Sequence, residues 1–295
     1  VICFIRKYFT GKKMKKIIHL SDLHIGYRDM EERFYRLIGN IMFKMQPADR
    51  YVIVITGDII DSARRDFFTA AKQAVGVLRQ AGYTVSIVPG NHDYANLLHG
   101  QKKNVQLFKA HFYLQPGRGY PRLDIIENTA FIGLDSMAEE LHWYDSLWAN
   151  GELGSGKGQQ IDRLDQMLKS PEVKACDYKV VYLHHHPFEP VGCLYKLKDA
   201  DAFCNVLKKH TIDALLFGHN HYGKKWNGFL NIPRCYDGGT STFKNGRKSE
   251  HRVIDLSRDA VFDYDGDFLG NHETQQEITC PRMITHSRTY REKNE

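Results

Sequence analysis

Five short segments of the sequence carry carboxylate, amide and imidazole side chains at spacings that suit metal ions. They read HLSDLH at residues 19–24, VITGDIID at 54–61, IVPGNHD at 87–93, VYLHHHP at 181–187 and LLFGHNH at 215–221. Imidazole nitrogens with carboxylate and amide oxygens suit manganese, iron or zinc. Cysteine is missing from all five segments, so a structural zinc site is not expected. The segments therefore predict a catalytic metal centre.

Two of the segments pair their candidate ligands at a spacing of two residues. Asp22 precedes His24 in this way, and His219 precedes His221. Because alternate side chains of an extended chain face the same side, each pair can point at one pocket.

The candidate ligands are too many for a single ion. Seven side chains qualify, namely Asp22, His24, Asp58, Asn91, His184, His219 and His221. Two ions that share a carboxylate would use them all, and a pair of metals suits in-line displacement at phosphorus. Two further carboxylates, Asp61 and Asp93, are expected to support the ligands or cap the backbone. The sequence thus predicts hydrolysis of phosphate esters.

Each segment follows an apolar run that has the length and composition of a β-strand. The first strands are predicted at residues 15–21, 51–58 and 83–91, with amphipathic helices between them at 30–45 and 66–82. This order is typical of α/β folds with a parallel core, in which ligands bind beyond the carboxyl ends of the strands. The five segments should therefore converge. The glycines before Asp58, Asn91 and His219 are expected to allow the sharp exit from strand to loop.

The rest of the chain continues the alternation of strands and helices. Further helices are predicted at residues 101–111, 159–170 and 199–210. Further strands are predicted at 123–128, 130–136, 178–184 and 212–219, followed by short β-like pieces at 224–231, 233–239 and 250–256. The pattern as a whole predicts fold class α/β.

Composition bounds the size and setting of the protein. The chain has 295 residues, 42% of them hydrophobic, and a formal charge of +6. One domain is expected at residues 14–266, with an N-terminal extension at 1–13 and a flexible polar tail at 267–295. No apolar run approaches the ~18 residues of a membrane span, so no membrane partner is expected. Six scattered cysteines without a C-x-x-C pair indicate reduced thiols and a cytoplasmic protein.

The ordered set D-x-H, G-D-x-x-D, G-N-H-D, H and G-H-x-H resembles the calcineurin-like metallophosphoesterases, over about Lys15–Thr242. The resemblance implies an αββα sandwich of two mixed β-sheets flanked by helices. It implies a first ion held by Asp22, His24, Asp58 and His221. It implies a second ion held by Asp58, Asn91, His184 and His219, with Asp58 shared. His92, beside Asn91, is implied to contact the phosphate and to protonate the leaving oxygen.

The run of three histidines before Pro187 leaves open which of them is the ligand. A run of this kind resembles bacterial class III cyclic-nucleotide phosphodiesterases, which implies that His184, the first to leave the strand, binds the metal. His185 is the alternative and would otherwise face away from the site. His186 should be held extended by the proline that follows it.

The substrate expected from the resemblance is a small phosphodiester, with cyclic nucleotides as a candidate, hydrolysed by a metal-bridging hydroxide. The metals would be manganese, iron or zinc. The alternatives are a DNA-repair-type exonuclease, which SDLHIGY at residues 21–27 also resembles, and a phosphomonoesterase. A metal-binding scaffold without catalysis is disfavoured because His92 and all the ligand positions are present. The sequence does not predict the oligomeric state.

A Gly- and aromatic-rich segment, Met137–Ser155, is the expected place of substrate contact outside the metal centre. It contains His142, Trp143, Tyr144 and Trp148. A hydrophobic flap packed on the core is the equally weighted alternative for these residues.

Overall fold

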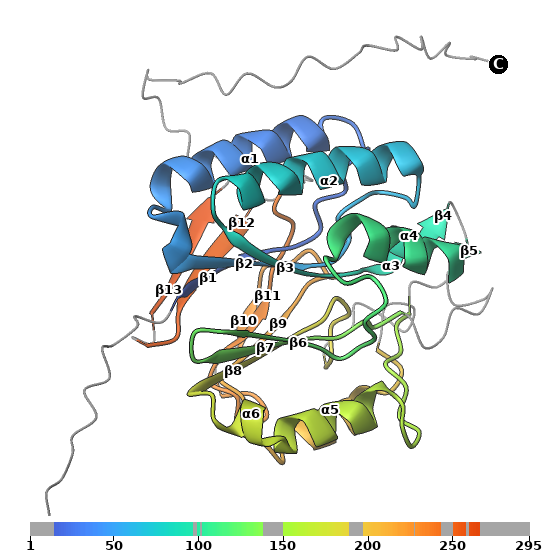
Figure 1. Ribbon diagram of the computed structural model, residues 1–295, viewed down its shortest axis with the longest axis vertical. Coiled ribbons are helices and arrows are strands. Elements are labelled where there is room, and N and C mark those ends of the chain that lie inside the picture. Colours follow the sequence, from blue (N-terminus) through green and yellow to red (C-terminus); the bar gives the residue numbers. More distant parts are fainter. Residues whose placement is uncertain are drawn as a thin grey trace, which may run out of the picture.

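Two β-sheets packed face to face form the frame of the protein, with helices on both outer sides (Figure 1). The computed structural model describes residues 15–96, 99–100, 102–137, 150–188, 197–226, 228–242, 250–257 and 260–265. The expected extension at 1–13, the tail at 267–295 and the aromatic residues of the 137–155 segment lie outside these ranges. The αββα sandwich of two mixed sheets is confirmed.

The first sheet has the strand order β13-β12-β1-β2-β3. Its strands are β1 (Lys16–Leu20), β2 (Tyr51–Thr56), β3 (Thr84–Val88), β12 (Glu250–Asp255) and β13 (Ala260–Asp265). The strands β1, β2 and β3 run parallel, with Leu20 paired with Ile55 and Thr56 paired with Val88. Their carboxyl ends therefore reach the same edge. β12 lies antiparallel to β1 on its other side.

The second sheet has the order β10-β11-β9-β8-β7-β6. Its strands are β6 (Arg122–Ile126), β7 (Thr129–Gly133), β8 (Tyr178–Tyr182), β9 (Ala214–Phe217), β10 (Lys225–Trp226) and β11 (Cys235–Asp237). The four strands β7, β8, β9 and β11 are parallel, and β6 and β10 are antiparallel edges. A separate two-stranded sheet joins β4 (Ala95–Asn96) to β5 (His99–Gly100).

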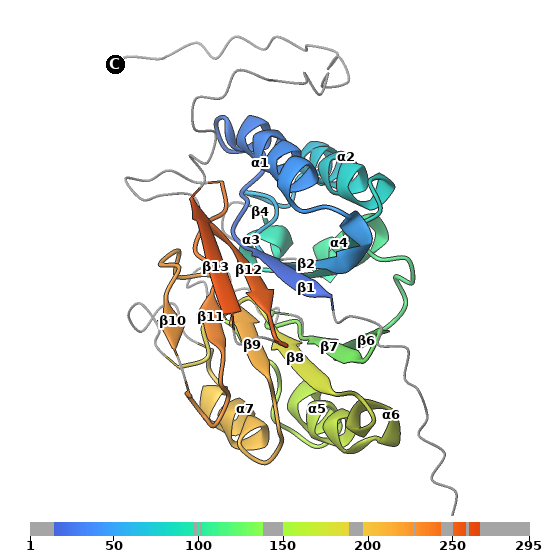
Figure 2. The same cartoon turned by 90° about the vertical axis from the view of Figure 1, so that its left-hand side faces the viewer.

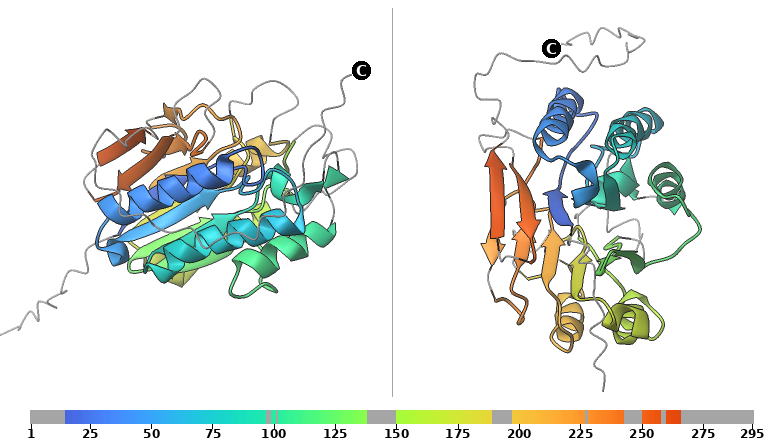
Figure 3. Two further views of the ribbon diagram at one scale, coloured as in Figure 1. Left: turned by 90° about the horizontal axis from the view of Figure 1, so that it is seen from above. Right: turned by 60° about the vertical axis from the view of Figure 1, so that its left-hand side comes forward.

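The helices cover the two outer faces, as the turned views make plain (Figures 2 and 3). Those beside the first sheet are α1 (Met30–Lys44), α2 (Arg65–Gln80) and α4 (Lys102–Phe112). Those beside the second are α5 (Gln160–Lys169), α6 (Pro171–Lys174) and α7 (Ala200–Leu207). The remaining helices are short, namely η1 (Ala48–Arg50) and α3 (Asn91–Tyr94). Among the described helices, none has the length and apolar character needed to cross a membrane.

Alternation along the strands explains the layers of the core. On β1, Ile18 packs in a cluster with Phe34 and Phe68 of the outer helices, whereas Ile17 packs in a cluster with Val180 of the opposite sheet. A third cluster joins the second sheet to α5 and α7. Strands buried on both faces require continuous apolar runs, and this is why the sequence marks them so clearly.

The predicted elements agree with the structure except where they are short or distant in sequence. The one-turn helices α3 and α6 were not predicted, because four residues carry no usable periodicity. The strand β13 was not predicted either, because its residues lack a clear apolar pattern. The β-like piece at 224–231 contains a strand of only two residues.

Candidate metal centre

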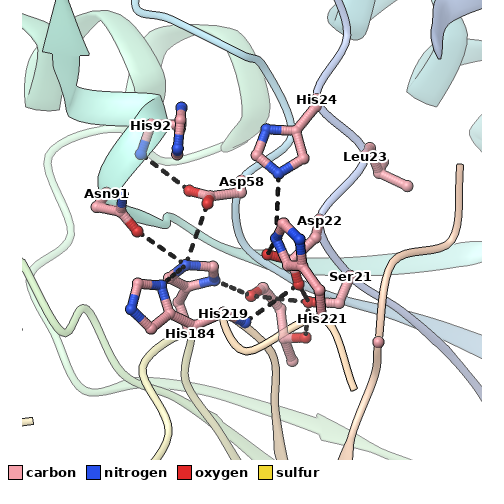
Figure 4. A network of polar contacts seen from close by, with 12 residues as sticks. Ser21, Asp22, Leu23, His24, Asp58, Asn91, His92, His184, His219 and His221 are labelled. Atoms are coloured by element: carbon pink, nitrogen blue, oxygen red, sulfur yellow. Dashed lines mark hydrogen bonds and ion pairs between the residues drawn. The ribbon is translucent and has the colours of Figure 1, made fainter. Parts of the chain in front are cut away.

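The five segments converge where strands of both sheets end (Figure 4). Asp22 and His24 follow β1, Asp58 follows β2, and Asn91 lies at the start of α3 just after β3. The remaining three follow the second sheet, with His184 after β8 and His219 and His221 after β9. All seven predicted side chains are thus brought together. The first sheet supplies the carboxylates and the second supplies most of the imidazoles.

The backbone at these positions differs from the extended geometry expected from the sequence. Five of the seven residues have positive φ, at 52° for Asp22, 46° for His24, 48° for Asp58, 74° for His219 and 58° for His221. A non-glycine residue in this left-handed region is uncommon, although Asp, Asn and His tolerate it best. Such strained positions cluster at functional sites. The pairs do meet, but through tight left-handed turns rather than alternation along a strand.

A first cluster consists of Asp22, His24 and His221. The Nε2 atom of His221 lies 3.0 Å from Oδ1 of Asp22 and 3.4 Å from Nε2 of His24. One ligand atom from each of the three residues falls within 4.8 Å of the others. These three residues can therefore surround one ion.

A second cluster is centred on Nε2 of His184. This atom lies 3.1 Å from Oδ1 of Asn91, 3.2 Å from Nδ1 of His219 and 3.3 Å from Oδ2 of Asp58. His184, rather than His185, is therefore the histidine of the run that joins the candidate ligands. Asp58 also forms a group with His24 and His92, so its carboxylate lies between the two clusters.

The chemistry of these donors fits bound cations. The Nδ1 of His184 donates to the carbonyl of Thr56 at 2.7 Å, which leaves Nε2 for a ligand. Burial disfavours a charged His184, but the carboxylate of Asp58 outweighs it and raises the pKa to about 10. Burial also opposes ionisation of Asp58, yet the same histidine lowers its pKa well below the usual value. The pocket therefore keeps its carboxylate charged and favours positive charge, as a metal site must.

The family model of the calcineurin-like phosphoesterases matches residues 15–223, which include every candidate ligand. The chain belongs to this family. It is accordingly a metal-dependent hydrolase of phosphate esters. The finding agrees with the ligand pattern in the sequence and with the convergence of that pattern in space.

Curated relatives of this calcineurin-like chain are identical to it at about a quarter of the aligned positions. A probable cyclic nucleotide phosphodiesterase from Fibrobacter succinogenes is 26% identical over 231 residues, covering 74% of this chain and 77% of that protein. A cAMP/cGMP dual specificity phosphodiesterase from Mycobacterium tuberculosis is 26% identical over 232 residues, covering 74% and 64%. A glycerophosphodiester phosphodiesterase from Enterobacter lignolyticus is 27% identical over 186 residues, covering 60% and 58%. The chain thus covers less than two thirds of the length of each of the last two proteins.

A solved structure supports the fold of the calcineurin-like chain. The purple acid phosphatase from yellow lupin seeds superposes with a TM-score of 0.55 at 12% identity, over 84% of this chain and 52% of that one. At this identity the likeness concerns the fold alone.

The two carboxylates expected in supporting roles have such roles in the structure. Asp93 accepts hydrogen bonds from the backbone N–H groups of Ile59, Ile60 and Gly90, at 3.0, 3.1 and 2.8 Å. It thereby ties the loop after β2 to the loop after β3. The carboxylate of Asp61 lies 3.5 Å from Nδ1 of His24, and its backbone carbonyl lies 2.7 Å from Nδ1 of His92.

The glycines beside the ligands are explained by space as much as by backbone conformation. Gly57 has a φ of 90°, as expected for a sharp exit from β2. Gly90 and Gly218 do not have positive φ, so at these two positions glycine is required by close packing. A Cβ at Gly90 would collide with Oδ1 of Asp58 and lie 2.5 Å from its backbone nitrogen. A Cβ at Gly218 would collide with the hydroxyl of Ser21.

The other two histidines of the run, His185 and His186, are also buried, and their rings pack against neighbouring side chains. His185 was expected to face away, but its ring packs against that of His219, with centroids 4.4 Å apart. Its Nδ1 lies 2.7 Å from the hydroxyl of Ser136. The next ring, that of His186, packs against Phe217 and Trp226. The sequence could not show this, because side-chain direction alternates only while the chain stays extended, and β8 ends before the run.

Proposed function

We propose that the protein hydrolyses small phosphodiesters, with cyclic nucleotides as the leading substrate class, at a centre of two metal ions. The observation that carries the proposal is the pair of ligand clusters with Asp58 between them. Relatives named as phosphodiesterases of cyclic nucleotides and of glycerophosphodiesters support the substrate class. The catalytic domain of the proposal is residues 14–266, and its setting is the cytoplasm, consistent with the free thiols of Cys176, Cys204 and Cys235.

The proposed ligands follow the two clusters. The first ion would be held by Asp22, His24, Asp58 and His221. The second would be held by Asp58, Asn91, His184 and His219. Manganese, iron and zinc suit these nitrogen and oxygen donors. Bound there, the pair would supply Lewis acidity toward the phosphate and lower the pKa of a water molecule.

His92 is proposed to bring the proton that the leaving oxygen needs. Its Nδ1 faces the carbonyl of Asp61, so this nitrogen carries a hydrogen and Nε2 is left for the substrate. Burial disfavours the protonated ring, but the negative charge of Asp58 and the bond to Asp61 raise its pKa above the usual value. A histidine that holds its proton near neutral pH can act as a general acid.

Asp58 also positions His92 through the backbone. Its Oδ1 accepts a hydrogen bond of 2.9 Å from the backbone N–H of His92, while Oδ2 faces His184. The carboxylate of Asp58 thus links the proposed acid His92 to the proposed ligand His184. Another proposed ligand, Asn91, directly precedes His92 in the chain. This arrangement would keep the acid and the phosphate in register.

The proposal is tested by a substrate panel with purified protein and added Mn²⁺. Bis-p-nitrophenyl phosphate, p-nitrophenyl phosphate, cyclic AMP and single-stranded DNA would be compared by kcat/KM, with bound metal counted on the same samples. We expect two ions per chain and a preference for the diesters over the monoester. Preference for DNA would favour the exonuclease alternative, and preference for the monoester would favour a phosphomonoesterase. A firm plateau at one ion would refute the two-metal centre.

A further inference from the structure

A buried chain of hydrogen bonds leads from β1 to the carboxylate of Asp22. The Nε2 of His19 lies 3.0 Å from the hydroxyl of Thr56, which lies 2.8 Å from the hydroxyl of Ser21. That hydroxyl in turn donates to Oδ2 of Asp22. All four side chains are fully buried, so water does not compete for these bonds.

The direction of every bond in this chain is fixed by its last member. An ionised carboxylate only accepts, so Ser21 must donate to Asp22, and Thr56 must then donate to Ser21. The other acceptor near the Thr56 hydroxyl, the carbonyl of Leu20, is more distant at 3.3 Å. With its own proton committed, Thr56 can only accept from His19. The imidazole of His19 therefore carries its hydrogen on Nε2.

The surroundings of His19 agree with this single tautomer. Burial, together with the charge of Arg252, lowers the pKa of His19 to about 3, so the ring is neutral. Arg252 is its direct partner across the pairing of β1 with β12. The Nδ1 of His19 is buried without a hydrogen-bond partner among the described residues, as suits a nitrogen that carries no hydrogen.

The hydroxyl of Ser21 is held in place by its neighbours. A Cβ at Gly218 would collide with this hydroxyl, and one at Gly238 would lie 2.7 Å from Cβ of Ser21. The backbone N–H of Ser21 donates to the hydroxyl of Ser241 at 3.1 Å. Gly218 and Gly238 therefore pack closely against Ser21 from two sides, and the hydroxyl of Ser21 has little freedom to turn away from Asp22.

The backbone of Thr56 serves the other ligand cluster. Its carbonyl accepts the hydrogen of Nδ1 of His184 at 2.7 Å, which turns Nε2 of that ring toward Asp58 and Asn91. The hydroxyl of Thr56 donates to the hydroxyl of Ser21, which in turn donates to Oδ2 of Asp22. The backbone N–H of His219 also reaches Oδ2, at 3.2 Å, so Oδ1 is the oxygen left to face His221.

We infer that Thr56 is a positioning residue for both ions, and that its two oxygen atoms act on different ones. The hydroxyl, with Ser21 and His19, fixes which oxygen of Asp22 is offered to the first ion. The carbonyl fixes which nitrogen of His184 is offered to the second. The inference rests on the proposed two-metal function. Hydrogen-bond partners of metal ligands typically change metal affinity about 10–100-fold when they are removed.

The test is a calorimetric titration of metal-free protein with Mn²⁺, which gives a separate Kd for each ion. Thr56→Val removes the hydroxyl but keeps the shape and the carbonyl, whereas Thr56→Ser keeps both oxygens. Ser21→Ala breaks the same chain one residue later. Ser86→Ala is the control, because it removes another buried hydroxyl of the first sheet, one bonded to Tyr182. Thermal unfolding of the metal-free variants verifies their folding.

For Thr56→Val and Ser21→Ala we expect the Kd of one ion to rise about 10–100-fold, with the other unchanged within about twofold. Thr56→Ser and Ser86→Ala should bind both ions as the wild type does. Equal weakening of both ions, a Thr56→Ser variant as weak as Thr56→Val, or two unchanged ions in Thr56→Val would overturn the inference. Should Thr56→Val fail to fold, Ser21→Ala decides by the same criteria. Wild-type protein that binds no Mn²⁺ would instead overturn the proposed function, and the inference with it.

Discussion

Asp58 is the side chain that lies between the two clusters of candidate ligands. It belongs to two of the three groups of candidate ligands and also binds the backbone of His92. We therefore expect Asp58→Ala to reduce the bound metal from two ions toward none, whereas His24→Ala should mainly weaken one. Metal content by mass spectrometry after reloading and desalting gives the answer. Two ions retained in Asp58→Ala would exclude it as the shared ligand.

A substitution of His92 can distinguish metal binding from proton transfer. Asn91, rather than His92, is the proposed ligand of this segment, so His92→Ala should leave the metal content and the fold unchanged. A nucleotide ester, whose leaving oxygen needs a proton, should lose about 10²–10⁴-fold in kcat, the usual contribution of a general acid. A p-nitrophenyl ester should lose far less, because p-nitrophenolate leaves without a proton. Equal losses on both esters would indicate that His92 only positions the phosphate.

At this scale the sequence predicted which side chains meet, but not how. Residue type and order were sufficient for Asp22, Asn91 and His221, because few side chains bind metals. The left-handed backbone at five of the ligands could not be predicted, since Asp and His adopt it only when the surrounding fold enforces it. The hydrogen-bond chain from His19 to Asp22 was missed for a similar reason, because it depends on Thr56, which lies 35 positions from Ser21 and 37 from His19.

Two glycines allow a test of how the elements present the ligands. Gly90 joins β3 to α3 and touches Asp58, whereas Gly76 lies within α2 with open space around it. We expect Gly90→Ala to displace Asp58 and to lower Mn²⁺ affinity at least tenfold. Gly76→Ala should keep the affinity and add about 0.5–1 kcal/mol to the free energy of unfolding, as alanine is the better helix former. Isothermal titration and denaturant unfolding measure the two effects.

An unchanged Mn²⁺ affinity in Gly90→Ala would show that the loop after β3 can shift without moving Asp58. A loss of stability in Gly76→Ala would show that α2 packs differently from the structure.

Among the elements, those with local signals could be predicted and those with distant partners could not. The apolar runs of β1, β2 and β3 are unmistakable because both faces of these strands are buried. The pairing of β1 with β12 involves residues more than two hundred positions apart, and no local pattern encodes it. The strand β13 pairs only with β12, and its edge position leaves it a weaker apolar pattern.

On the scale of the whole molecule, the bound ions would connect the two sheets. Asp22, Asp58 and Asn91 follow strands of the first sheet, and His184 and His219 follow strands of the second. Each ion at a hundredfold excess over its Kd should add about 2.7 kcal/mol to the free energy of unfolding. We expect Mn²⁺ to raise the Tm of the metal-free protein and EDTA to reverse the rise. A similar rise in Asp58→Ala would mean that the stabilising ions bind elsewhere.

A buried carboxylate that is not a candidate ligand should make the stability depend on pH. Burial raises the pKa of Asp237 from 3.8 to about 7, and the charge of Asp22 adds to the effect. The folded state thus holds a proton that the unfolded state releases near pH 4. Stability from this group is complete below pH 4 and is lost as the pH rises to about 7. In metal-free protein, Asp237→Asn should gain stability over the wild type across this range, then keep a constant advantage.

Denaturant unfolding of both proteins at several pH values measures that difference. A difference that stays constant from pH 4 to 7 would show that Asp237 titrates normally.

The placement of β12 beside β1 has a consequence for the newly made chain. Translation proceeds from the N-terminus, and Glu250 at the start of β12 follows Leu20 at the end of β1 by 230 positions. At ~5–20 residues per second, the ribosome takes roughly 10–50 s to cover that stretch. Until then the outer edge of β1 is open, and an open edge can pair with other nascent chains. The strand that presents Asp22 is thus made long before the strand that covers its outer edge.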